Sequence, residues 1–192
     1  MTDDQTIDGY LDNQLLVAMP GMLDPGFARS VTLMCQHTSE GAIGITINRE
    51  SSFTLGEIFD QLKVECEDEA LRAQPVLEGG PVSPERGFVL HSPGRGFESS
   101  MNLAGGSIAV TTSRDVLAAI AAGEGPDQFL VALGYAGWTD GQLEAELREN
   151  AWLSVPTDQT IVFDAPLAER WNRAVGNLGV DISHLHDHGG RA

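Results

Sequence analysis

Short apolar runs, most of them bounded by glycine or proline, alternate along this chain with stretches whose apolar residues recur every three or four positions. The short runs predict strands, and the periodic stretches predict helices. A tight turn at 39–41 separates two of the runs, which are therefore expected to form an antiparallel hairpin. The expected strands are residues 14–19, 30–37, 42–48, 76–77, 87–91, 98–103, 108–112, 129–133 and 159–163.

Two helices are predicted from paired capping residues. Thr54 and Glu57 have the spacing of a capping box, in which a hydroxyl and a carboxylate each satisfy a backbone N–H, and they begin a helix over 54–62. Thr139 and Gln142 have the same spacing and begin a helix that runs to about residue 150.

Two further helices are predicted from single capping residues. One covers 114–122, with Ser113 as its cap and Gly123 in the left-handed conformation at its end. The other begins after Asp164 and ends at Gly179. Residues 65–72 are acidic and fit either a short helix or a loop.

The order of these elements predicts an α/β fold in which helices pack against a mixed sheet, because strands and helices alternate with hairpins among them. The 192 residues suit a single domain, and no interior linker or repeat divides them. We expect one domain over 11–185 between flexible ends at 1–10 and 186–192.

The chain carries 11 Lys and Arg against 28 Asp and Glu, a net charge of −17. Non-specific nucleic-acid binding depends on clustered basic side chains, and the sequence has no such cluster, so direct nucleic-acid binding is not expected. No run of 18 apolar residues predicts a membrane helix. Residues 1–8 lack the basic start and apolar stretch of a signal peptide, so the expected location is the cytoplasm.

The common catalytic signatures are missing from the sequence. It contains no phosphate-binding P-loop, no dinucleotide-binding glycine pattern, no nucleophile elbow and no zinc-protease helix. The two cysteines, Cys35 and Cys66, form no CxxC motif, and Cys35 is expected to be a small buried residue. We therefore assign no catalytic residue, cofactor or metal from motifs.

Two histidines form the first candidate site. His37 and His91 each end a predicted strand, and the two are expected to meet at one sheet edge if they act together. A pair of imidazoles there would bind metal or transfer protons. The alternative is that each is a buried histidine satisfied by a backbone carbonyl.

The segment Glu78-Gly79-Gly80-Pro81-Val82 is the second candidate. Two glycines permit a positive φ or a close backbone approach, and backbone N–H groups in such a bend can hold an anion. The alternative is a tight turn after a strand, fixed by Pro81.

The third candidate is Gly134-Tyr135-Ala136-Gly137-Trp138, which leads directly to Gln142 and Glu144. An aromatic pocket with an anion-binding helix N-terminus has this composition. A corner where a strand packs against a helix has it too. With Asn48 added, the candidates for ligand or partner binding are His37, Asn48, Gly79, Gly80, Pro81, His91, Tyr135, Trp138, Gln142 and Glu144.

Alternating histidines near the C-terminus, His184, His186 and His188, are the fourth candidate. Such a spacing can bind nickel, zinc or copper. The alternative is an incidental run in a terminal segment.

The chain resembles the YqgE/AlgH family over about residues 11 to 185. The segments that carry the resemblance are 15–37, GAIGITIN at 41–48, LEGGPV at 77–82, RGFVLHS at 86–92, 111–126 and GYAGWTDGQLEAELRENAWL at 134–153. The resemblance implies a bacterial, cytoplasmic protein of one α/β domain, whose bifurcated sheet curls towards a partial barrel with helices outside. The family is described as transcriptional regulators through a link to alginate production, with no agreed catalytic residue or cofactor. Its sequences usually end in GHA, whereas this chain ends in Gly189-Gly190-Arg191-Ala192.

Three hypotheses about function follow. The first is a regulatory or adaptor protein, a monomer or weak homo-oligomer, that binds an unidentified protein or small molecule. The second is a transcriptional regulator that binds DNA directly. The third is a hydrolase-like enzyme that uses His37 or His91 with Glu78 or Glu144.

Overall fold

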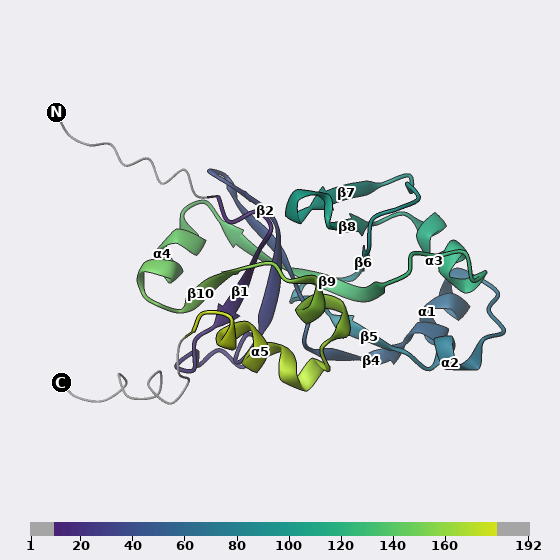
Figure 1. Cartoon of the computed structure of the whole chain (residues 1–192), viewed down its shortest axis with the longest axis horizontal. Coiled ribbons are helices and arrows are strands. Elements are labelled where there is room, and N and C mark those ends of the chain that lie inside the picture. The colour runs from purple at the N-terminus through teal and green to yellow at the C-terminus, as the bar shows by residue number, and fades with distance from the viewer. Residues whose placement is uncertain (1–9, 180–192) are drawn as a thin grey trace.

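The computed structural model describes residues 10–179, and within them ten strands form one sheet (Figure 1). The strands are β1 (Gln14–Ala18), β2 (Val31–Thr38), β3 (Gly41–Thr46), β4 (Glu50–Thr54), β5 (Pro75–Glu78), β6 (Val82–His91), β7 (Ser100–Leu103), β8 (Ile108–Thr111), β9 (Phe129–Thr139) and β10 (Trp152–Pro156). The helices are α1 (Leu55–Leu62), α2 (Glu69–Arg72), α3 (Arg114–Ala121), α4 (Gln142–Arg148) and α5 (Leu167–Gly176). No helix in this range is long and apolar enough to span a bilayer.

The sheet runs in the order β10-β1-β2-β3-β9-β6-β8-β7, with antiparallel neighbours throughout this path. The strand β9 belongs to two halves of the sheet. Along one edge it pairs first with β5, in parallel, and then with β3, while β6 pairs along its other edge. The sheet therefore forks at β9 and curls into a half-barrel with the helices outside (Figure 1), so the predicted fold class is confirmed.

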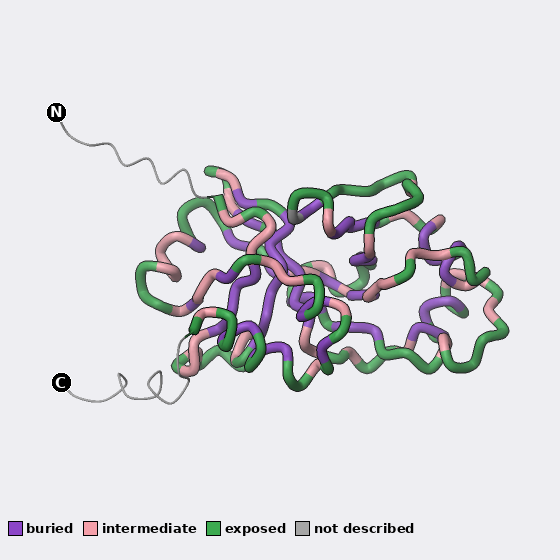
Figure 2. Tube along the Cα trace, viewed as in Figure 1, coloured by how far each residue is buried: buried purple, intermediate pink, exposed green. Residues whose placement is uncertain are grey.

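Three buried clusters hold the helices on the sheet. The largest lies under α5 and includes Leu33, Ile45 and Trp171. A second packs α1 and α3 on β5, β6 and β9 through residues such as Phe59 and Val116. The third lies under α4 and joins β2, β9 and β10. Figure 2 shows the result: buried residues follow the central strands, while the loops and outer helix faces are exposed.

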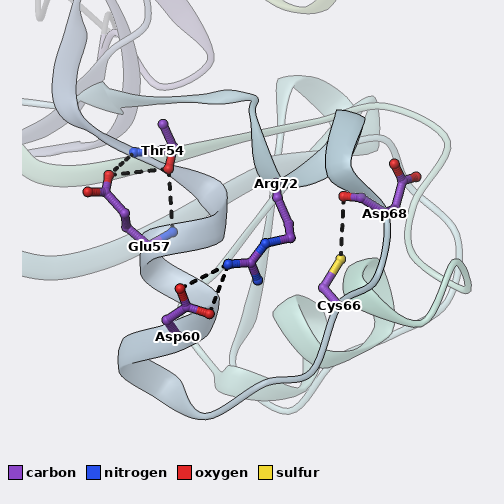
Figure 3. Close-up of polar contacts among 6 residues, drawn as sticks. All are labelled: Thr54, Glu57, Asp60, Cys66, Asp68 and Arg72. Atoms are coloured by element: carbon purple, nitrogen blue, oxygen red, sulfur yellow. Dashed lines mark hydrogen bonds and ion pairs between the residues drawn. The ribbon is translucent and has the colours of Figure 1, made fainter.

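The helix α1 begins with the predicted capping box (Figure 3). The Thr54 N–H donates to Glu57 Oε2 at 2.7 Å, and the Glu57 N–H donates to Thr54 Oγ1 at 3.4 Å. Arg72, at the end of α2, donates to both carboxylate oxygens of Asp60 on α1, at 3.0 and 2.9 Å (Figure 3). The acidic stretch 65–72 thus contains a short helix that an arginine ties to its neighbour.

One predicted strand is wrong, and the strands β4 and β10 were not predicted. Residues 159–163 do not form a strand; Thr160–Asp164 is a π-helical turn, held at its start by the Asp158 carboxylate, which accepts from the Thr160 N–H at 2.9 Å. The strand that completes the sheet is instead β10, which within residues 10–179 pairs with β1 alone, at the sheet edge. Periodicity missed it because its burial is partial and it follows α4 after a short turn.

The predicted helix starts also need correction. The helix α4 begins after Gly141, whose φ is 71°, although Gln142 Oε1 does accept from the Thr139 N–H at 3.0 Å. Asp164 does not cap α5, whose N-cap position is Pro166; its carboxylate accepts instead from the Gln128 amide at 2.7 Å. Ser113 precedes α3 without capping it through its side chain. The predicted end of α3 is confirmed, since Gly123 has a φ of 75°.

The capping box predicts a measurable loss of stability. Thr54→Ala removes the hydroxyl that accepts from the Glu57 N–H, so we expect the free energy of unfolding to fall by about 1 kcal/mol. Ser52→Ala, on the exposed side of β4, is the control and should change it by less than about 0.5 kcal/mol. Urea denaturation measures both, and equal effects of the two substitutions would contradict the capping role.

Candidate functional site

A groove opens on the sheet between the β2–β3 hairpin on one side and β6, β7 and β8 on the other, with β9 between them. It consists of two adjoining cavities of about 450 and 390 Å³. Gln36, Ile43 and Tyr135 line both cavities, so the two form one continuous depression. Together they have the size of a ligand site or of a channel for a peptide.

Large apolar side chains are exposed in this groove. Ile43 is 37% exposed, Val82 36% and Met101 49%. Phe88 and Tyr135 pack edge to face beside them, with ring centroids 5.9 Å apart. Single exposed apolar residues are ordinary on a protein surface, but their gathering in one depression marks a binding surface.

A β-bulge in β2 decides which side chains face the groove. The pairing with β3 shifts between Met34 and Gln36, so one extra residue stands in β2. Cys35 and Gln36 consequently both line the groove, while His37 turns to the opposite face, towards α4. The sequence pattern of period two had placed Cys35 and His37 on one face, and the bulge makes that prediction wrong.

The Cys35 thiol is not a nucleophile in this groove. Burial, and secondarily the negative charge of Asp12, raises the pKa of Cys35 to about 12. The thiol lies 3.7 Å from the Leu33 carbonyl oxygen, to which it donates. Because only a thiolate attacks readily, the raised pKa disfavours Cys35 as a nucleophile at neutral pH.

Arg86 supplies the positive charge of the groove. Its guanidinium lies 5.3 Å from the centre of the Phe88 ring, a cation–π contact, and it forms no ion pair with a carboxylate of residues 10–179. Glu40 and Glu98 also line the depression. The groove therefore offers apolar pockets with charges of both signs at its margin.

Gly79 and Gly80 lie where the sheet forks. The Gly79 N–H donates to the Leu133 carbonyl of β9 at 2.8 Å, and the Gly79 carbonyl accepts from the Thr46 N–H at 2.8 Å. A Cβ on Gly80 would lie 2.1 Å from the Tyr135 carbonyl carbon. The glycines thus permit a close backbone approach, and because the Gly79 N–H is bonded within the sheet it is not free to hold an anion. Pro81 has no N–H to offer.

The two histidines do not meet. His91 pairs with Phe129 at one end of β9, whereas His37 pairs with Ala42, which in turn pairs with Trp138 near the other end. Nine positions along a strand span roughly 30 Å. Of the two alternatives for these histidines, the shared site is therefore wrong.

Both ring nitrogens of His37 are occupied. Nδ1 accepts from the Leu11 N–H at 3.0 Å, which leaves the proton of the neutral ring on Nε2, and Nε2 lies 2.8 Å from Glu144 Oε1. The ring also contacts Tyr10 edge on, at 5.4 Å. His37 and Glu144 do come together, but as a link between β2, the preceding chain and α4, with no nitrogen left to act as a base.

His91 is likewise satisfied within the fold. Nδ1 lies 2.8 Å from the Ser92 carbonyl oxygen, which can only accept, so Nδ1 carries the proton and Nε2 accepts from Thr111 Oγ1 at 2.8 Å. The side chain is 2% exposed. For His91 the alternative of a buried histidine bonded to a backbone carbonyl is confirmed. Glu78 forms no hydrogen bond with either histidine in the described residues.

Tyr135 and Trp138 point to opposite faces of β9, because they are three positions apart on a strand. Tyr135 lines the groove, whereas the Trp138 side chain packs under α4 against Trp152. The segment 134–138 continues β9 and forms no pocket of paired aromatic residues. The alternative, a strand that packs against a helix, is confirmed, because Trp138 joins β9 to α4.

Glu146 is a residue that the sequence reasoning missed. Its Oε2 accepts from the indole N–H of Trp138 at 2.9 Å and of Trp152 at 2.8 Å, and its Oε1 accepts from the Gln142 amide at 3.0 Å. The four side chains fasten α4 to β9 and β10. The spacing of Gln142 and Glu146, four positions apart on a helix between two tryptophans, was the available signal.

The remaining candidates have separate positions. Asn48 bridges the loop before β2, since its Oδ1 accepts from the Val31 N–H and its Nδ2 donates to the Arg29 carbonyl, both at 2.8 Å. His184, His186 and His188 lie outside the described residues, as do most of the two ends expected to be flexible. Within residues 10–179, no three His, Cys, Asp or Glu side chains gather as metal ligands.

Comparisons with known proteins agree on one family. A family model described as AlgH-like matches residues 15–183. A UPF0301 protein of Xanthomonas campestris pv. campestris (strain 8004) is 53% identical over 182 residues, which cover 95% of this chain and 96% of that protein. A UPF0301 protein of Xanthomonas oryzae pv. oryzae (strain PXO99A) is 52% identical with the same coverage.

Two solved structures are similar to this one. The solution structure of the AlgH protein from Pseudomonas aeruginosa matches with a TM-score of 0.79 and 46% identity, covering 100% of both chains. A crystal structure of a Corynebacterium diphtheriae protein matches with a TM-score of 0.72 over 91% of this chain and 90% of that one. At 20% identity, the second likeness concerns the fold alone.

The link between His37 and Glu144 predicts a pH effect. Partial burial by itself raises the pKa of Glu144. Two hydrogen bonds, from its own N–H and from His37, act in the opposite direction, as does the attraction of His37 and Arg148. These effects outweigh the burial, so the pKa of Glu144 is lowered from 4.5. The ionised carboxylate therefore stabilises the fold at a pH above 4.5, the ordinary pKa of the group. This contribution is lost as the pH falls through the lower pKa that Glu144 has in the folded protein.

We expect Glu144→Gln to be less stable than the unsubstituted protein at about pH 6, and this difference to shrink towards about pH 3. Denaturant unfolding across that range measures it. Glu149→Gln, at the exposed end of the same helix, is the control and should show no such convergence. A pH-independent difference for Glu144→Gln would show that the carboxylate charge is irrelevant.

The fork predicts a steric effect. Gly80→Ala forces a Cβ against the β9 backbone at a φ of 153°, so it should cost about 2 kcal/mol or more of unfolding free energy. Gly87→Ala has nothing within 4 Å of its Cβ and serves as the control, with an expected change below about 0.5 kcal/mol. Thermal unfolding compares the two, and a neutral Gly80→Ala would refute the close approach.

Proposed function

This chain belongs to the AlgH-like family of uncharacterised UPF0301 proteins, and on that premise we propose that it is a regulatory or adaptor protein. In this proposal it binds a segment of a partner protein in the groove and catalyses no reaction itself. The observation that carries the proposal is the gathering of exposed Ile43, Val82 and Met101 in one continuous depression.

The absence of a poised catalytic group supports binding over turnover. An enzyme site needs a nucleophile or base within reach of an orienting partner. In the groove the thiol of Cys35 is held protonated, and both candidate histidines lie outside it with their ring nitrogens bonded. The groove thus has anchoring side chains without reactive ones.

The shape of the site favours an extended peptide. The strand β7 ends the strand order, so within the described residues one of its edges carries unpaired backbone groups, and Ser100 and Met101 beside that edge line the groove. A peptide strand added at such an edge gains main-chain hydrogen bonds and places alternate side chains into adjoining pockets. Ile43 and Tyr135 would receive its apolar anchors.

The charge of the chain bears on the partner and the compartment. A net charge of −17 with Arg86 as the groove's cation gives little hold on a phosphate backbone, so a protein partner is favoured over direct DNA binding. We also propose that the protein is located in the cytoplasm. Its acidic composition is compatible with that location, and none of the described helices could span a bilayer.

Site-directed photo-crosslinking in the native host tests the proposal. A benzoylphenylalanine in place of Ile43, within the groove, should crosslink to a discrete partner. The same residue in place of Leu23, which is 93% exposed but outside the groove, is the matched control and should not. Combining the Ile43 probe with Tyr135→Ala should abolish the crosslink while the melting temperature shows that the fold persists. Equal crosslinking at both positions would refute the groove as the binding surface.

A further inference from the structure

The helix α5 buries a charged side chain. Leu167, Trp171 and Val175 form its apolar stripe, and Arg170 lies on the same face with only 3% of its surface exposed. An arginine in this position is unusual, because a buried cation loses its hydration and is ordinarily matched by a carboxylate.

No carboxylate of the described residues pairs with Arg170. Its Nε donates to the Ala165 carbonyl at 3.0 Å and its Nη1 to the Ile47 carbonyl, whereas Nη2 makes no hydrogen bond to residues 10–179. Burial alone lowers the pKa of Arg170 to about 10. The guanidinium is therefore tied in place by two carbonyl dipoles, and no carboxylate of the described residues offsets its charge. Nη2 is not among the buried atoms left without a partner, so it retains some contact with solvent.

Other arginines also lack an ion pair: Arg49 and Arg114 donate to backbone carbonyls as Arg170 does, but among the arginines of residues 10–179 Arg170 alone is buried. On the same helix, Arg173 lies 2.6 Å from the Glu169 carboxylate, and Arg72 contacts Asp60 at 2.9 Å. With 28 acidic residues available, an internal partner for Arg170 would be easy to supply. Among residues 10–179 Arg170 is the one arginine that is almost wholly buried, and the missing carboxylate leaves its charge open to an anion from outside.

A cavity of about 170 Å³ lies next to Arg170. Gln74 is its only polar uncharged lining residue, and Arg170 is the only charged one. The other lining residues are apolar or nearly so: Leu55, Pro75, Leu77, Phe129, Leu130, Val131 and Leu167. The cavity thus combines a fixed cation with hydrocarbon walls.

We propose that this cavity binds a small carboxylate with a short hydrocarbon tail. The carboxylate accepts hydrogen bonds from Nη2 of Arg170, the nitrogen that Ala165 and Ile47 leave free, and the tail packs against Leu77 and Phe129. A monoanion fits better than a phosphate, because a single guanidinium in apolar surroundings offers one positive charge and few donors. The site is separate from the groove and adds a ligand class to the proposed function.

Titration of the unsubstituted protein with hexanoate, followed by amide NMR, is the first test. Saturable shifts are expected at the lining residues of β5 and β9, at Leu77 and from Phe129 to Val131. Hexanamide, which has the same tail without the charge, should bind at least about tenfold more weakly. No saturable shift with hexanoate, or equal binding of hexanamide, would overturn the proposal, and neither result depends on a variant that folds.

Substitution of Arg170 is the second test. Arg170→Gln should weaken hexanoate binding by about tenfold or more, since it removes the charge and Nη2. Arg173→Gln, exposed on the same helix, is the matched control and should leave binding unchanged. Tyr135→Ala, in the groove, should also leave it unchanged. If Arg170→Gln folds and binds hexanoate as tightly as the control, the arginine merely ties two carbonyls together and the proposed site is wrong.

Discussion

The close contact between Gly79-Gly80 and β9 is the constraint on which the rest of this structure depends. Gly79 bonds to β9 through its N–H and to Thr46 of β3 through its carbonyl, so it stands at the point where the neighbour of β9 changes from β5 to β3. Gly134, with a φ of 74°, lies opposite, and a Cβ there would lie 2.4 Å from the Gly80 carbonyl oxygen. A side chain at either position would push the two halves of the sheet apart, and the groove is built where those halves meet.

The bulge in β2 gives that groove its chemistry. Without the extra residue at Cys35, the regular alternation would turn Gln36 away from the depression and His37 towards it. With it, His37 reaches Glu144, and α4 is held from two sides, by this contact and by the indole N–H groups that Glu146 accepts. A single inserted residue thus separates a structural histidine from a binding surface.

Local chemistry could be predicted from the sequence, and long-range pairing could not. The Thr54–Glu57 capping box, the β2–β3 hairpin and the glycine end of α3 depend on residues within a few positions of one another, and all three are present. The strand β10 was missed, and the sequence left open whether His37 and His91 meet, because both depend on which strands become neighbours and in what register. The family resemblance supplied the forked sheet, but neither it nor periodicity indicated Glu146 or the buried charge of Arg170.

The two proposed sites share β9 but are physically independent. Residues Phe129 to Val131 line the Arg170 cavity, and Tyr135 and Gly137 line the groove. Between them Gly134 interrupts the regular pleat with its positive φ, and the partners of β9 change at the same point. A ligand beside Arg170 contacts α5 and β5, whereas a peptide in the groove contacts β3 and β7. The groove proposal therefore depends on the exposed apolar side chains in the groove, and the Arg170 proposal depends on a buried charge without a carboxylate partner. If one proposal is refuted, the other is unaffected.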